Sequence, residues 1–67
     1  MATVVKIGKW AIDLEAICSA HFEGSKLFIH QQGGRFLSLE GEDADRLWQA
    51  YVVGALDLRT GEVVSRA

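Results

Sequence analysis

The chain changes its hydrophobic period at Gly41. Before this residue, apolar side chains mostly alternate with polar ones in short runs that are interrupted by glycine. After it, apolar residues recur at the 3.6-residue spacing of an amphipathic helix. The pattern predicts an α+β fold, in which an antiparallel β-meander of four to five strands is followed by one C-terminal amphipathic helix.

The alternation predicts five strands, at residues 3–7, 10–14, 16–22, 26–31 and 35–40. Gly8-Lys9 is typical of a two-residue hairpin loop. This loop pairs Ile7 with Trp10 and Val5 with Ile12, so that all four apolar side chains lie on one face. The polar positions fall on the other face, and this separation favours the register.

Gly24-Ser25 predicts a second two-residue loop, which pairs Phe22 with Leu27 and Cys18 with Gln31. In this register Cys18 lies on the face that collects the aliphatic side chains, as a small core residue. The opposite face carries Ile17, Ser19, His21, Phe28 and His30.

The register of the fifth strand depends on the length of the preceding loop. A three-residue loop, Gln32-Gly33-Gly34, pairs Ile29 with Leu37 and gives Gly34 the left-handed conformation. A two-residue loop would exchange the faces and leave Leu37 beside His30. We favour the three-residue loop because it gathers the aliphatic side chains on a single face.

The helix is predicted to begin just after Gly41. Acidic residues at its start suit the helix dipole, and Gly54 suits the position after its last turn, although the helix could continue to Leu58. Residues 55–67 are then a short hairpin or a frayed tail, outside a core of about 3–53 in a single domain of 1–67. The apolar stripe consists of Ala44, Leu47, Trp48, Tyr51 and Val52.

With 67 residues, the chain buries a small core and needs additional stabilisation. The single Cys18 excludes an internal disulfide, and two histidines with one cysteine give no metal-ligand spacing. No motif for catalysis or for a cofactor is present, so we expect no enzyme activity, cofactor or metal. Homo-oligomerisation, as a dimer or a higher assembly, remains as the stabilising device.

Charge and hydropathy narrow the classes of partner. The net charge is −2, residues 1–40 are neutral, and dense basic runs are absent, which disfavours nucleic acid. The longest apolar runs are too short for a membrane span. The start at Met1 has no secretory pattern, so together with a free cysteine it predicts a cytoplasmic protein without membrane contact.

The predicted registers leave an apolar face that one helix does not cover. We expect this face to be an interface with a second copy or another protein. An alternative function is a weak single-stranded nucleic-acid-binding module, in which Phe28 and Phe36 stack on bases beside Lys6, Lys26 and Arg35. The candidate interface consists of Val4, Ile17, His21, Phe28, His30 and Phe36.

The element order of residues 3–53 resembles the single-stranded-DNA-binding transcriptional coactivator fold. That resemblance implies a helix-swapped dimer, but the basic strands with which that family binds DNA are not matched here. The run Trp10-Ala11-Ile12-Asp13-Leu14-Glu15-Ala16-Ile17 also resembles the opening of many small bacterial proteins of unknown function. A Sm-like or SH3-like small barrel is another way to close such a meander.

Overall fold

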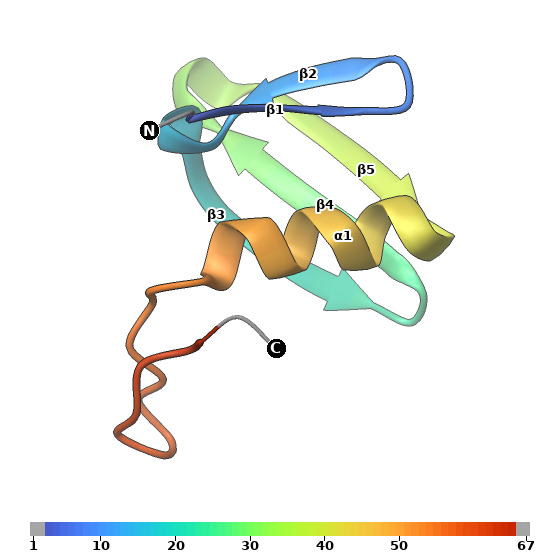
Figure 1. Cartoon of the computed structure of the whole chain (residues 1–67). Helices are drawn as coiled ribbons and strands as arrows, with labels where there is room; N and C mark the ends of the chain where they lie inside the picture. Colours follow the sequence, from blue (N-terminus) through green and yellow to red (C-terminus); the bar gives the residue numbers. More distant parts are fainter. Residues whose placement is uncertain (1–2, 66–67) are drawn as a thin grey trace.

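The computed structural model describes residues 3–65 and confirms the α+β prediction, with five antiparallel strands followed by one helix (Figure 1). The predicted domain limits at residues 1 and 67 lie outside the described residues. The elements are β1 (Val4–Ile7), β2 (Trp10–Asp13), the 3-10 turn η1 (Leu14–Ala16), β3 (Ile17–Glu23), β4 (Lys26–Gln31), the 3-10 turn η2 (Gln32–Gly34), β5 (Phe36–Glu40) and α1 (Gly41–Val52).

The strands form two sheets, β1-β2 and β3-β4-β5, instead of one continuous meander. The turn η1 separates them, and the side chain of Asp13 accepts a hydrogen bond from the backbone N–H of Glu15 at its start. Figure 1 shows the β1-β2 hairpin lying across the three-stranded sheet, on the side that α1 covers. The hairpin and the helix therefore share one face of the sheet.

Most of the predicted registers are confirmed. Ile7 pairs with Trp10 in the first hairpin, Phe22 pairs with Leu27 in the second, and Ile29 pairs with Leu37 after the three-residue loop. The loop itself differs in one respect, because both Gly33 and Gly34 have positive φ, at 80° and 79°. Both positions therefore use conformations that glycine adopts readily.

The register prediction for the start of β3 is wrong. Gln31 pairs with Ile17 and not with Cys18, because the β3-β4 register shifts between Ile17 and Ser19. Such a shift is a β-bulge, in which one extra residue on one strand bends it. The bulge turns Ile17 into the core, where 8% of its surface is exposed, and leaves Cys18 exposed.

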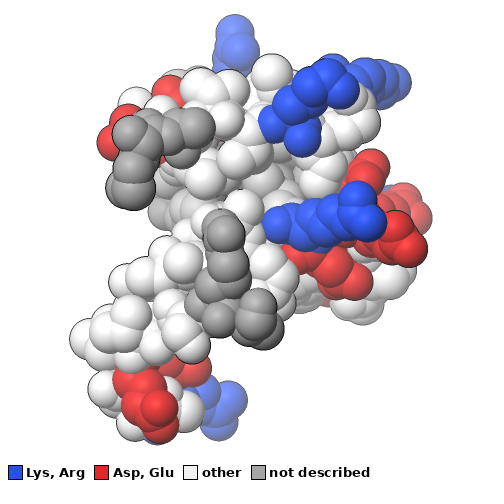
Figure 2. Space-filling view, in the orientation of Figure 1, with Lys and Arg blue, Asp and Glu red and all other residues white. Residues whose placement is uncertain are grey.

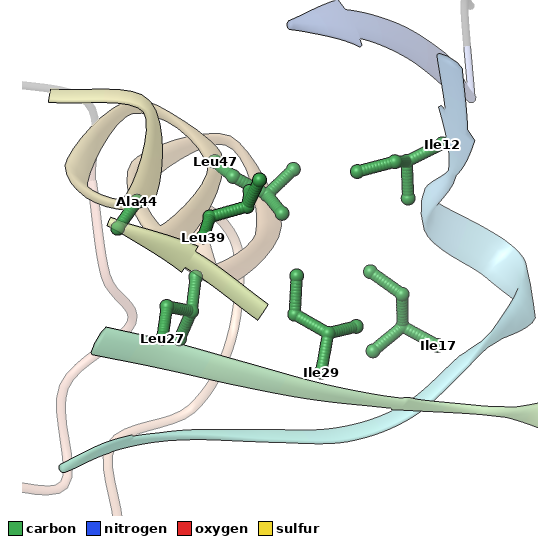
Figure 3. Close-up of a cluster of buried hydrophobic side chains, with 7 residues drawn as sticks. All are labelled: Ile12, Ile17, Leu27, Ile29, Leu39, Ala44 and Leu47. Carbon is green, nitrogen blue, oxygen red and sulfur yellow. The ribbon is translucent and has the colours of Figure 1, made fainter. Parts of the chain in front are cut away.

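The core lies between the three-stranded sheet, α1 and the β1-β2 hairpin (Figure 3). Ala44 and Leu47 enter it from the predicted stripe of α1, and Trp48 is half-buried at its margin. Phe22, at the edge of the sheet, meets the Trp48 ring edge-on, with ring centroids 5.3 Å apart. The buried members are Ile12, Ile17, Leu27, Ile29, Leu39, Ala44 and Leu47.

The helix ends at Val52 and does not reach Leu58, since Gly54 follows with a φ of 89°. Residues 54–64, which we call the arm, then form a small hairpin with a single bridge between Leu56 and Val63. Of the two alternatives for this segment, a hairpin or a frayed tail, the structure has the hairpin. Within residues 3–65, no helix has the length and apolar character to cross a bilayer.

Candidate interaction surface

Four rings lie on the face of the three-stranded sheet that points away from α1. Strand alternation brings them there from three strands, since His21 is opposite Phe28 on β3 and β4, and His30 is opposite Phe36 on β4 and β5. We call this group the aromatic face. Its members are His21, Phe28, His30 and Phe36.

Each ring of the aromatic face contacts two others, so the four rings form a closed group. The centroid of His21 lies 5.4 Å from that of Phe28 and 5.6 Å from that of His30. The centroid of Phe36 lies 5.6 Å from Phe28 and 5.3 Å from His30. These separations lie within the range of favourable aromatic pairs.

The rings remain open to solvent although they contact one another. Phe36 is 57% exposed, His21 and His30 are exposed, and Phe28 is half-buried. The sheet beneath them is held by the buried Leu27, Ile29 and Leu39 side chains on its other face. The fold thus presents a contiguous, partly exposed group of rings on one face of the three-stranded sheet.

A row of charges crosses the three strands next to the rings. Lys26 is the direct partner of Glu23 on one side and of Glu40 on the other, and its Nζ lies 3.6 Å from Glu40 Oε1. His21 Nε2 lies 3.6 Å from Glu23 Oε1. The row carries two carboxylates and one ammonium group, so it adds no positive charge to the aromatic face.

The structure brings together four of the six predicted interface residues. Ile17 was expected on the aromatic face, but the bulge directs it into the core. Val4 is 56% exposed, but its strand belongs to the two-stranded sheet on the other side of the core. The structure therefore places the four rings together and separates Ile17 and Val4 from them.

Sequence reasoning missed the apolar surface of the arm. Leu56, Leu58 and Val63 expose 58%, 87% and 63% of their surfaces. The alternation of Leu56, Asp57 and Leu58 signals a strand, but it does not say whether the strand packs on the body of the molecule. Whether these three side chains are exposed depends on the direction in which the arm leaves α1, and the sequence does not specify that direction.

The two histidines of the aromatic face are not arranged to share a metal ion. The His21 and His30 rings are stacked with an angle of 14° between their planes, so their in-plane nitrogen lone pairs do not converge on one point. No group of three or more potential metal ligands occurs among residues 3–65.

The comparisons with known proteins add no relative to this picture. No protein-family model matches the chain, and neither the curated proteins nor the solved structures gave a significant match.

Proposed function

We propose that the chain is a non-catalytic, homo-oligomeric interaction domain of the cytoplasm, and that its aromatic face is the surface on which two copies meet. The observation that carries the proposal is the closed group of four rings on one sheet, three of them exposed and Phe28 half-buried. Two such faces pack by ring contacts and exclude water from both. The exposed thiol of Cys18 suits a reducing compartment.

The surface area of the chain supports self-association. A compact monomer of 7.4 kDa is expected to expose about 4,200 Å², whereas this chain exposes 5139 Å². The excess, about 900 Å², is close to the ~800 Å² that each partner contributes to a standard protein interface. Part of this excess belongs to the arm, where Leu56, Leu58 and Val63 are exposed, so the excess is consistent with self-association but does not locate the interface.

The charges favour a protein surface over single-stranded nucleic acid. A base-stacking surface needs cations that follow the phosphate backbone. Of the three basic residues expected to serve it, Lys26 lies between two glutamates and Lys6 belongs to the other sheet. Arg35 immediately precedes Phe36 in extended backbone, so strand alternation directs its side chain to the opposite face.

Light scattering after size exclusion, at micromolar concentrations, tests the proposal. The wild-type chain should elute as a dimer or larger, and Phe36→Asp should shift it towards a smaller assembly. Val4→Asp is the matched control, since Val4 is as exposed as Phe36 but lies on another sheet. A monomeric wild type, or equal effects of both substitutions, would contradict the proposal.

The nucleic-acid alternative is tested separately. Fluorescence polarisation with labelled single-stranded DNA and RNA should show no saturable binding at moderate salt. Binding that is lost in Phe28→Ala and Phe36→Ala would instead assign the rings to base stacking.

A further inference from the structure

The outer side of the three-stranded sheet is a grid of nine side chains, three from each strand. Strand pairing sets its rows, because directly opposite residues of antiparallel strands lie on the same face. One row holds the charges described above, and the other two hold the four rings of the aromatic face with two serines. The rows are Glu23, Lys26 and Glu40; His21, Phe28 and Ser38; and Ser19, His30 and Phe36.

Both histidines of the chain lie in this grid, as stacked diagonal neighbours. The centroids of His21 and His30 are 5.6 Å apart, and both side chains are exposed. Imidazole is the side chain whose ordinary charge changes between about pH 5 and pH 8. Two neutral rings stack favourably at this separation, whereas two imidazolium ions repel each other. The stack therefore loses stability when both rings carry a proton.

The two histidines differ in their charged neighbours. His21 Nε2 lies 3.6 Å from Glu23 Oε1, so a proton on His21 is compensated by a carboxylate on its own strand. His30 has Ser19 opposite it on β3 and Phe36 opposite it on β5. It forms no ion pair within the described residues 3–65. A proton on His30 is therefore the one that the surface does not compensate.

Protonation of the histidines reverses the net charge of this side of the sheet. With neutral rings, the two carboxylates and the Lys26 ammonium group give −1, and protonation of both rings gives +1. Figure 2 shows the other charges over the β1-β2 hairpin and near the start of α1, which cover the opposite face of the sheet. Arg46, on that helix, is paired with Glu42 at 3.5 Å. The charge of the aromatic face is therefore set by its own residues.

We infer that the aromatic face is a pH-sensitive contact, which joins two copies while His21 and His30 are neutral and releases them when both are protonated. The inference rests on the proposed function, in which two such faces meet. Contact removes the rings from water, and a buried imidazolium without a carboxylate loses its hydration. The separated copies consequently bind more protons than the assembly. Lowering the pH favours separation, and raising it favours association.

Sedimentation equilibrium at about pH 7 and about pH 5.5, at constant ionic strength, tests the inference. The dissociation constant of the wild-type assembly should be larger at the lower pH by about tenfold or more. Glutamate and aspartate ordinarily titrate near pH 4, below this range, so the change reports on the two histidines. Circular dichroism should be the same at both pH values. Loss of the folded signal at the lower pH would overturn the inference, because unfolding would then explain the separation.

Single substitutions distinguish the two histidines. His30→Gln should associate at both pH values with nearly the same strength, because the uncompensated charge cannot form. His21→Gln is the matched control, since it removes the histidine that has a carboxylate beside it, and it should keep most of the pH dependence. Equal pH dependence in the two variants would overturn the inference.

The result for the wild type separates this inference from the proposed function. A wild type that is monomeric at about pH 7 would contradict both. A wild type that is dissociated by Phe36→Asp but associates equally at the two pH values would overturn the pH dependence alone. The aromatic contact would then stand without its control by protons.

Discussion

Two neighbouring residues, Ile17 and Cys18, show how a single residue decides what a surface contains. The bulge in β3 buries Ile17 in the core and exposes Cys18 on the outside. In a regular strand they would have had the opposite environments, because successive side chains alternate between faces. Ile17 would have enlarged the aromatic face, but it packs in the core on the opposite side of the sheet.

Substitutions at this pair should differ strongly in their effect on stability. We expect Ile17→Ala to reduce the free energy of unfolding by about 2–4 kcal/mol, because it removes buried methyl groups. Cys18→Ala should change it by less than about 0.5 kcal/mol, since the side chain is exposed. Urea denaturation of both variants measures the difference. A larger loss of stability at Cys18 would mean that β3 has a regular register, with Cys18 buried in place of Ile17.

The bulge marks the limit of what alternation can predict for a residue. The pattern gave the correct partners for His21, Phe28, His30 and Phe36, because aliphatic residues recur at every second position of β4 and β5 and fix which face is buried. Ile17, Cys18 and the small residues after them fit either face equally well. Their placement depends on the direction in which the chain leaves η1 and enters β3. The local sequence does not specify that direction.

At the scale of elements, the η2 loop gives a sharp expectation. Gly33→Val and Gly34→Val should each lower stability by about 1–2 kcal/mol, because both glycines have left-handed φ. Arg35→Val is the control, since Arg35 has a φ of −74°. Thermal melts of the three variants measure the effect, and a loss at Gly34 alone would mean that Gly33 is not left-handed in solution.

The contact of α1 with the edge of the sheet can be measured by a double-mutant cycle. Trp48→Ala should cost about 3 kcal/mol, near the lower end for aromatic truncations, because Trp48 is half-buried. The coupling energy between Phe22→Ala and Trp48→Ala should be about 0.5–1.5 kcal/mol, as for other edge-to-face pairs. Coupling near zero would mean that α1 is placed differently over the sheet.

Elements were the most predictable level of this protein. The apolar stripe predicted which side of α1 is buried, and Gly54 indicated where the helix ends. Both signals are local in the sequence. The division into two sheets was not predictable. A meander and a hairpin folded across a sheet share the β1-β2, β3-β4 and β4-β5 pairs. Only the meander also pairs β2 with β3, and the path between Asp13 and Ile17 decides between the two arrangements.

For the whole molecule, stability should depend on protein concentration. If copies associate through the aromatic face, association stabilises the folded state, and Tm should rise as concentration rises. Phe36→Asp should weaken this dependence, whereas Val4→Asp should leave it unchanged. Calorimetry over a hundredfold range of concentration measures it, and a constant Tm for the wild type would contradict self-association.

The pairing of each strand with a neighbour in the chain also determines how the protein acquires its structure. The β1-β2, β3-β4 and β4-β5 hairpins each close through a short loop, so the entropy lost in closing them is small. Such local topology is typical of rapid folding. The sequence contains no proline, so no slow isomerisation delays any molecule. A newly made chain should therefore bury its core quickly and as a monomer, before its exposed rings meet those of another copy.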